Sequence, residues 1–205
     1  MEISQLPVYQ KRQFVPENAN LTDAPTVVGL YEQLEKQAIH SASELEKWML
    51  ERSEVDAALS QAGSILYIRM TCQTDDPAIA GAYTKFVESI PPAIKPINDR
   101  LNHKYVELRS KFPLDAKRYG VYDRGIKTDI ELFVEKNIPL QTKVDLLSQE
   151  YQTICGAMSV NFQGKEHTMP QMSKYLLETD RSLRESAWKA SAERRLQDKD
   201  KLLDK

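Results

Sequence analysis

Residues 158–188 read MSVNFQGKEHTMPQMSKYLLETDRSLRESAW, and this stretch sets a short piece of β-structure apart from helices. Val160 and Phe162 alternate with polar residues, which is the two-residue period of a half-buried strand. Gly164 tolerates the positive φ of a tight turn, and the residues after it return as a second short strand. The stretch therefore predicts one small β-hairpin near residues 158–168.

Signals for helices follow the hairpin directly. Thr168 can cap a helix that accepts Pro170 in its first turn. Thr179 or Asp180 can cap a second helix, which continues with apolar residues on adjacent turns. The charged segment after Asp180 has no glycine, asparagine or proline stop signal, so we expect this last helix to run off the end of the sequence.

The rest of the chain carries apolar residues at helical spacing. Thr22 or Asp23 can cap a first helix that holds Pro25 in its first turn. Ser43 and Glu46 match a capping box at the start of a long second helix. Glycine is scarce, at 7 residues of 205. Together these signals predict an all-α fold with the hairpin as its single β-element.

Prolines and glycines indicate where the middle of the chain should break. Residues 75–77 (Asp-Asp-Pro) are a helix start, with an acid at the cap and proline in the first turn. The proline pair 91–92 should end that helix, so we expect two antiparallel helices here. Gly120 and Gly125 suggest an irregular joint before a helix of about residues 128–136.

These signals divide the chain into three parts. Residues 1–22 carry two prolines and little periodicity, so we expect an extended lead-in. Residues 23–157 should form a region of antiparallel helices. Residues 158–205 should form the hairpin followed by two helices, the last running off the chain end. A length of 205 residues fits one large domain or two small ones.

Composition excludes several classes of function. The 28 basic and 30 acidic side chains give a formal charge of -2, whereas nucleic-acid binders usually show a basic excess. No apolar run approaches the ~20 residues that cross a bilayer, and no signal-peptide pattern is visible. Cys72 and Cys155 do not suggest a disulfide framework. We therefore expect a reduced, cytoplasmic protein without nucleic-acid or membrane partners, with Cys155 and Trp48 as core residues.

The hairpin stretch also resembles a known family. The resemblance rests on Phe162-Gln163-Gly164-Lys165-Glu166, Thr168, Pro170-Gln171, Asp180-Arg181, Arg184-Glu185, Ala187-Trp188 and Ala192-Glu193-Arg194-Arg195. These residues are similar to the region that precedes the catalytic site of oligoendopeptidase F, in the thimet-oligopeptidase-like family of zinc metalloendopeptidases. The match is specific over about residues 162–195 and weaker from about residue 26 onward. Ser186 departs from it, because an acidic residue is expected there.

This resemblance implies a fold and a division of labour. The chain would be the N-terminal helical part of a channel-forming metallopeptidase, with helical walls beside a deep channel that admits short unfolded peptides. The full-length enzyme would take oligopeptide substrates and bind zinc, whose bound water is the nucleophile. The zinc ligands and the glutamate base would lie in a C-terminal catalytic region or chain, so the resemblance implies no cofactor within this chain.

The sequence contains no His-Glu-x-x-His, the helical motif that holds zinc between two imidazoles one turn apart. None of the three histidines, His40, His103 and His167, begins it. Glu44 and Glu107 lie four residues after the first two, but a helix salt bridge explains such pairs more simply than a metal site. We therefore predict no catalytic, cofactor-binding or metal-ligating residue, and no activity for this chain alone.

Three interpretations remain open. The chain is the non-catalytic N-terminal portion of a zinc-dependent oligoendopeptidase, or it is a free-standing helical scaffold or protein-interaction module. It could also be an unrelated helical bundle whose hairpin matches by chance. An open reading frame past the codon for Lys205 that encodes His-Glu-x-x-His would favour the first, and a native stop codon would favour the second.

Overall fold

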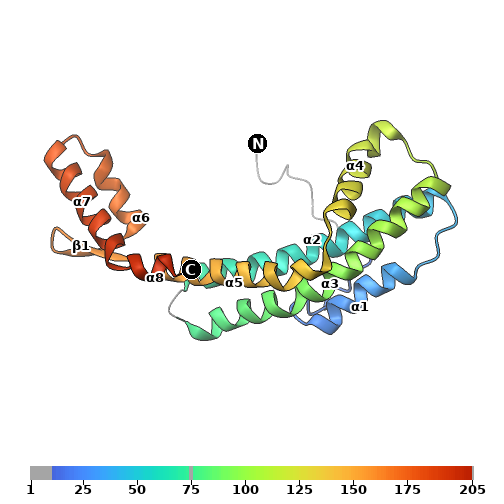
Figure 1. Ribbon diagram of the computed structural model, residues 1–205, viewed down its shortest axis with the longest axis horizontal. Helices are drawn as coiled ribbons and strands as arrows, with labels where there is room; N and C mark the ends of the chain where they lie inside the picture. The colour runs from blue at the N-terminus through green and yellow to red at the C-terminus, as the bar shows by residue number, and fades with distance from the viewer. Residues whose placement is uncertain (1–10, 74–75, 205) are drawn as a thin grey trace. The chain divides into compact units, whose positions relative to one another are not determined.

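The computed structural model describes residues 11–73 and 76–204 of the 205-residue chain (Figure 1). Within these residues the fold is all-α apart from one two-stranded antiparallel sheet, as the sequence predicts. The helical elements are α1 (Ala24–Lys36), α2 (Ala42–Cys72), α3 (Pro77–Lys111), α4 (Ala116–Leu132), η2 (Glu135–Asn137), α5 (Ile138–Gly156), α6 (Met169–Met172), η3 (Ser173–Leu177), α7 (Arg181–Gln197) and α8 (Lys199–Leu203). The strands are β1 (Ser159–Phe162) and β2 (Lys165–Thr168).

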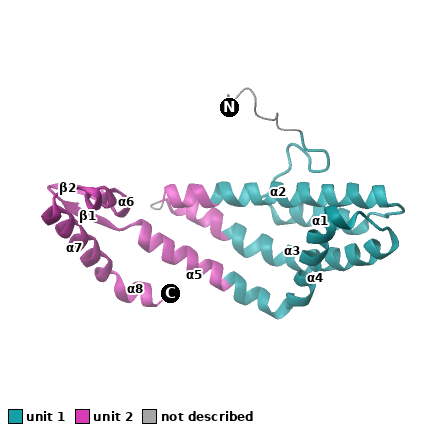
Figure 2. Ribbon diagram, turned by 90° about the horizontal axis from the view of Figure 1, so that it is seen from above, with its two compact units in different colours: residues 1–66, 85–142 teal, residues 67–84, 143–205 magenta. Residues whose placement is uncertain are grey.

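The chain divides into two compact units, each built from two separate stretches (Figure 2). Unit 1 takes residues 1–66 and 85–142, and unit 2 takes residues 67–84 and 143–205. Helices α2, α3 and α5 contribute residues to both units. The predicted boundaries at residues 22 and 157 remain predictions, and residues 1–10 of the predicted lead-in lie outside the described part.

In unit 1, α1 packs against α2 and α3. The Asp23 carboxylate caps α1 by accepting from the Thr26 backbone N–H at 3.0 Å. At the other end of α1, the Lys104 ammonium on α3 donates to the carbonyl oxygens of residues 34, 35 and 37, at 3.0, 2.8 and 2.6 Å. The Trp48 indole N–H on α2 donates to the Leu34 carbonyl at 2.9 Å. Trp48 is fully buried, which confirms its predicted place in the core.

Helix α3 is one continuous helix of 35 residues, so the predicted pair of antiparallel helices is wrong. Pro91, Pro92 and Pro96 all lie inside it, although proline removes a backbone donor and crowds the preceding turn. The buried side chains of α3 recur at helical spacing across the prolines: Phe86, Val87, Ile90, Ile94, Ile97, Leu101, Tyr105 and Leu108. Burial of this stripe outweighs the local cost of the prolines.

Two other local predictions for unit 1 are corrected. Helix α4 runs through Gly120 and Gly125, so the predicted irregular joint is absent and the helix ends at Leu132. Helix α2 begins two residues earlier than the Ser43 cap requires. Ser41 Oγ accepts from the Glu44 N–H at 3.2 Å, while the Glu44 carboxylate accepts from the His40 N–H at 2.8 Å. Ser41 and Glu44 therefore take the place of the predicted pair Ser43 and Glu46, but the box is not reciprocal, because Glu44 accepts from the residue before the cap.

In unit 2, the hairpin folds around a two-residue turn. Gln163 and Gly164 have φ values of 52° and 75°, as a type I′ turn requires. The sequence predicted the positive φ of Gly164 but not that of Gln163. The hairpin packs on α6 and α7 through a small core of Val160, Met172 and Ala187.

The caps predicted after the hairpin form as expected, but the last helix is broken. Thr168 and Gln171 make a reciprocal capping box at α6, and Asp180 caps α7 by accepting from the N–H groups of the next turn. Asp198 interrupts the single terminal helix that the sequence predicts. Its buried carboxylate accepts from Arg194 Nη1 at 2.6 Å and from Lys201 at 2.7 Å, and α8 begins after it.

Candidate functional site

The histidines do not form a metal site. His103 Nε2 lies 3.7 Å from Asp99 Oδ2, one turn before it, whereas Glu107 pairs with Lys111. The expected contact between His103 and Glu107 is therefore absent, because His103 faces Asp99 and Glu107 faces Lys111. His40 donates its backbone N–H, and not its imidazole, to the Glu44 carboxylate.

His167 is buried in the hairpin module. Its Nε2 lies 3.2 Å from the Tyr175 hydroxyl, and the two rings meet edge to face at 5.3 Å. Of the predicted cap at residues 75–77, Asp75 lies outside the described residues, and Asp76 accepts from the Ala78 N–H at 2.8 Å. Across residues 11–73 and 76–204, no three His, Cys, Asp or Glu side chains gather where a metal could bind. These residues do not fit a zinc ion.

A partly satisfied cation is buried in unit 1. Arg52 lies on the apolar face of α2, one turn from both Trp48 and Val55. Its Nη2 donates to Asn102 Oδ1 at 2.7 Å, and its Nε lies 4.0 Å from Asp56 Oδ2. Its Nη1 is buried without a hydrogen-bond partner among the described residues. The sequence carried a signal for this network. Arg52 falls at the helical spacing of the apolar residues Trp48 and Val55, and a charged side chain buried on such a face needs polar partners.

Glu54 fixes the lead-in segment to α2. Its carboxylate accepts from the backbone N–H groups of Gln13, Phe14 and Val15, at 3.0, 2.9 and 2.8 Å. Burial alone would raise the pKa of Glu54, but these three donors outweigh it and hold the pKa below its ordinary value. The Val15 side chain is buried beside this anchor. Sequence analysis did not identify Glu54, since its partners are backbone groups.

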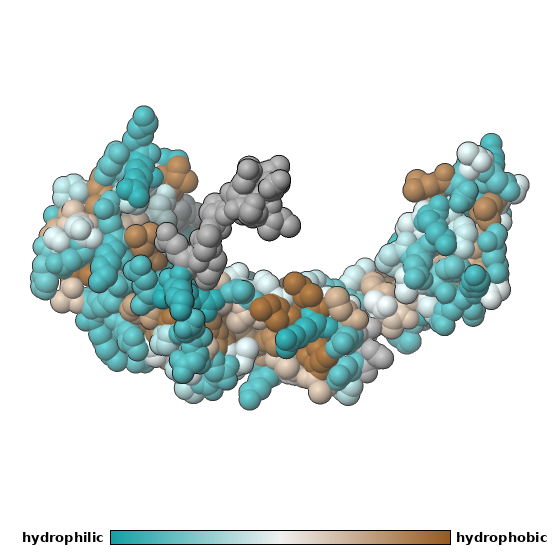
Figure 3. All heavy atoms as spheres, turned by 180° about the vertical axis from the view of Figure 1, so that it is seen from behind, coloured by the Kyte–Doolittle hydropathy of each residue, from teal (hydrophilic) through white to brown (hydrophobic). Residues whose placement is uncertain are grey.

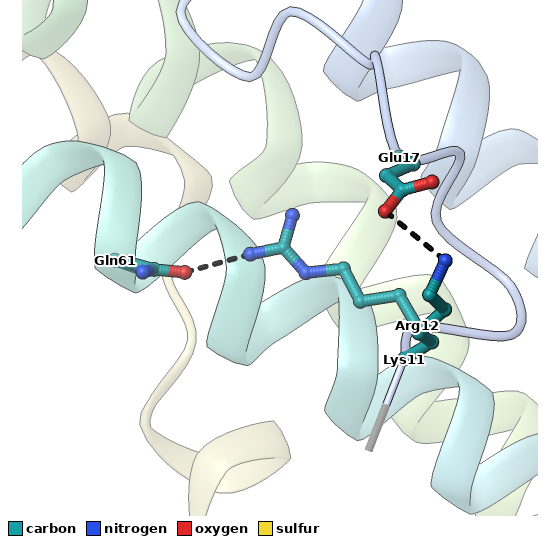
Figure 4. Close-up of a pocket in the computed structure, with 4 residues that line it drawn as sticks. All are labelled: Lys11, Arg12, Glu17 and Gln61. Carbon is teal, nitrogen blue, oxygen red and sulfur yellow. Dashed lines mark hydrogen bonds and ion pairs between the residues drawn. The ribbon is translucent and has the colours of Figure 1, made fainter. Parts of the chain in front are cut away.

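Two cavities in unit 1 are lined by polar side chains that already bond to one another. One of about 280 Å³ is lined by Lys11, Arg12, Glu17 and Gln61 (Figure 4). Arg12 Nη2 donates to Gln61 Oε1 at 2.7 Å, and the Lys11 ammonium lies 3.7 Å from Glu17 Oε1. Figure 4 marks both contacts with dashed lines. Another, of about 210 Å³, adjoins the loop between α1 and α2, where Glu51 accepts from Gln37. In the first cavity, the Arg12 guanidinium has a neutral partner in Gln61, and the Lys11 ammonium has a carboxylate partner in Glu17.

A larger cavity of about 330 Å³ lies in unit 2, between the end of α2 and the end of α5. It is lined by Tyr67, Met70, Thr71, Tyr151, Gln152, Thr153, Cys155 and Gly156. Cys155 is half-buried at this cavity, which corrects its predicted place in the core. The spacing of Tyr151 and Cys155 on α5 could have shown that they share a face, but not that α2 faces them.

Several helices expose apolar side chains, which appear as brown patches in Figure 3. Helix α5 has no buried residue, although apolar side chains recur in it at steps of three and four. Its Leu140, Val144 and Tyr151 are 61%, 55% and 48% exposed and lie on one face. Trp188 on α7 is also exposed. None of the helices in the described part is long and apolar enough to cross a membrane.

Comparison with protein families gives one match. A family model described as the Peptidase M3 N-terminal domain matches residues 20–133, more than half of the chain. The matched region contains α1 to α4. It does not include residues 162–195, where the resemblance in sequence is most specific, so the two observations come from different parts of the chain. No curated protein and no solved structure matches the chain.

Proposed function

Because the chain belongs to the Peptidase M3 N-terminal domain family, we propose that it forms a helical wall of the substrate channel of a zinc-dependent oligoendopeptidase. The family identifies the chain as an N-terminal region of a metallopeptidase. The channel and the preference for short unfolded peptides are the proposed part. The observation that carries the proposal is a family match over a purely helical region in a sequence that lacks His-Glu-x-x-His.

The proposal assigns catalysis to another polypeptide region. The described residues do not fit a zinc ion, so the metal and the groups that act on the scissile bond would come from a C-terminal catalytic region or a separate chain. This chain would contribute walls that exclude folded proteins. Its two free cysteines are consistent with the cytoplasmic location that belongs to this proposal.

The exposed face of α5 supports a role in a larger assembly. A helix with regular apolar spacing usually buries that face against a neighbour. In α5, Leu140, Val144 and Tyr151 instead remain exposed in the isolated chain. A catalytic region or an extended peptide would cover such a face.

The test compares the isolated chain with the protein recovered from its native cell. We expect the purified 205-residue chain to retain no stoichiometric zinc after gel filtration and to leave fluorogenic oligopeptides intact. We expect the native material to contain zinc and to cleave them, with this sequence and a His-Glu-x-x-His sequence in one complex or one chain. One zinc per isolated chain together with peptide cleavage would overturn the proposal.

The second candidate is a helical scaffold or interaction module without catalytic activity. The exposed face of α5 favours it equally, because such a face can dock another protein. The same experiment separates the two functions. Recovery from the native cell without any zinc-bearing sequence, as a monodisperse species that cleaves no peptide, would support the scaffold and contradict the channel wall.

A further inference from the structure

The cavity between the ends of α2 and α5 has the size and lining of a small-molecule site. Its volume of about 330 Å³ falls at the lower end of the range that ligand pockets occupy, roughly 300–1,000 Å³. The described residues that line it all belong to unit 2. The Met70 side chain is 3% exposed and gives the cavity an apolar, polarisable floor.

Aromatic rings lie on both helices that line this cavity. Tyr67 comes from α2 and Tyr151 from α5, and both are partly exposed. The Tyr67 ring is tilted by 59° against Tyr83 with the ring centroids 5.7 Å apart, which fixes its orientation. Aromatic pairs favour tilted and edge-to-face contacts, so a planar ring in the cavity would have two aromatic partners.

The polar groups of the cavity favour an uncharged ligand. Among the described residues, no charged side chain lines it. The hydroxyls of Thr71 and Thr153 donate to the carbonyls of Ile68 and Gln149, each at 3.0 Å, so their protons are already engaged. An ion would therefore lose its hydration without gaining a counter-charge.

Gln152 indicates that a ligand of this cavity should carry a hydrogen-bond donor. It lines the cavity, and its Oε1 is buried without a hydrogen-bond donor among the described residues. Buried amide oxygens in folded proteins almost always have a donor. The terminal torsion of glutamine is soft, so the amide can turn its oxygen toward a group in the cavity.

We propose that this cavity binds an uncharged aromatic ring that carries an N–H donor, with the ring between Tyr67 and Tyr151 and the N–H directed to Gln152 Oε1. Indole is the simplest such group. It can come from a free small molecule or from the tryptophan side chain of a peptide. The inference rests on the chemistry of this cavity, and it shares with the proposed channel function only Tyr151, which also belongs to the exposed face of α5.

The test uses the full 205-residue chain, with indole and N-methylindole as a matched pair of probes in calorimetric titration. We expect indole to bind one to one, and N-methylindole to bind about tenfold more weakly because it cannot donate to Gln152. In Gln152→Leu the two probes should bind alike. Gln197→Leu, an exposed glutamine on α7, is the matched control and should keep the tenfold difference.

A second readout needs no variant. Cys155 lines the cavity and Cys72 is exposed outside its lining, so saturating indole should slow alkylation of Cys155 and leave Cys72 unchanged. Absence of protection at Cys155, or equal affinities of the two probes for the unmodified chain, would overturn the proposal. An acetylated, amidated peptide with a central tryptophan distinguishes the sources. Tighter binding of this peptide than of indole assigns the site to a peptide side chain, and weaker binding assigns it to a free small molecule.

Discussion

Arg52 donates a hydrogen bond to Asn102 across 2.7 Å, and both residues are buried between α2 and α3. The neighbouring Asp56 lies 4.0 Å from the guanidinium and also accepts from the Tyr31 hydroxyl at 2.6 Å. A buried cation with a distant counter-charge depends on its neutral acceptors. The first prediction follows from this dependence.

We predict that Arg52→Met and Asn102→Leu are each destabilising but are not additive. Either change leaves a buried polar partner unsatisfied, at a cost of about 1–3 kcal/mol. The double variant removes the donor and the acceptor together, so its cost should fall below the sum of the single costs by about 1 kcal/mol. Urea unfolding of the four proteins measures this coupling. Strict additivity would show that the hydrogen bond contributes nothing.

Glu54 makes the attachment of the lead-in dependent on pH. Its pKa is lower in the folded chain than in the unfolded chain, so its stabilisation is complete above the unfolded value of about 4.3 and is lost as pH falls through the folded value. We predict that Glu54→Gln weakens the attachment of residues 13–15 by about 1 kcal/mol at neutral pH. Amide hydrogen exchange at Phe14 and Val15 measures the effect.

The exposed Glu17 provides the matched control for Glu54. Glu17 and Lys11 are both 86% exposed and 3.7 Å apart, and such surface pairs contribute little. Glu17→Gln should therefore leave the exchange of residues 13–15 unchanged at every pH. If amide exchange at Phe14 and Val15 in Glu54→Gln matched that of the unmodified chain at neutral pH, Glu54 would not hold the lead-in segment on α2.

Lys104 should be the most important lysine for the stability of unit 1. Its ammonium binds three carbonyl oxygens at the end of α1 and lies 5.5 Å from the centre of the Trp48 ring. We predict that Lys104→Met lowers the free energy of unfolding by about 2 kcal/mol, since charged donors make the stronger hydrogen bonds. Lys36→Met removes only an exposed pair with Glu32 and should change stability by less than about 0.5 kcal/mol. Equal effects in denaturant unfolding would contradict this role.

The hairpin turn should respond in opposite directions to substitutions at its two positions. Gln163 carries a positive φ that asparagine adopts more readily, so Gln163→Asn should stabilise the hairpin by a few tenths of a kcal/mol. Gly164→Val should destabilise it by about 1 kcal/mol or more, because φ is 75° there. Exchange rates of the strand amides in β1 and β2 report both changes. The same sign for both would exclude the type I′ turn.

Local signals in the sequence were sufficient for much of the fold. The caps at Asp23, Thr168 and Asp180 form as predicted, because each depends on residues within one turn of it. The hairpin also lies where strict alternation of apolar residues placed it. Short-range hydrogen bonds and burial agree at all these positions.

The failures occur where distant contacts decide. The proline pair 91–92 should break a helix, yet the stripe through Ile90 and Ile94 is buried on both sides of it. Gly120 and Gly125 lie inside α4, whose Tyr119 bonds to Glu46 on α2. Neither partner can be identified from local spacing.

The candidate sites show the same limit. Arg52 interrupts the apolar spacing of α2, so a buried polar network could have been predicted there. The cavity at Gln152 could not, since it exists only because residues about 80 positions apart in sequence, in α2 and α5, line one volume. The family resemblance did not indicate the cavity, because its specific part covers residues 162–195, which do not line the cavity.

The interleaving of the two units determines how this protein can be dissected. Each unit draws on two separate stretches, so no single cut in the polypeptide separates one unit completely from the other. A truncation after Thr142 would remove residues 143–205, with which residues 67–84 form unit 2, and would expose the buried Met70 to water. An experiment that isolates one unit of this protein therefore needs two cuts in the polypeptide, and a circular permutant needs both stretches of each unit.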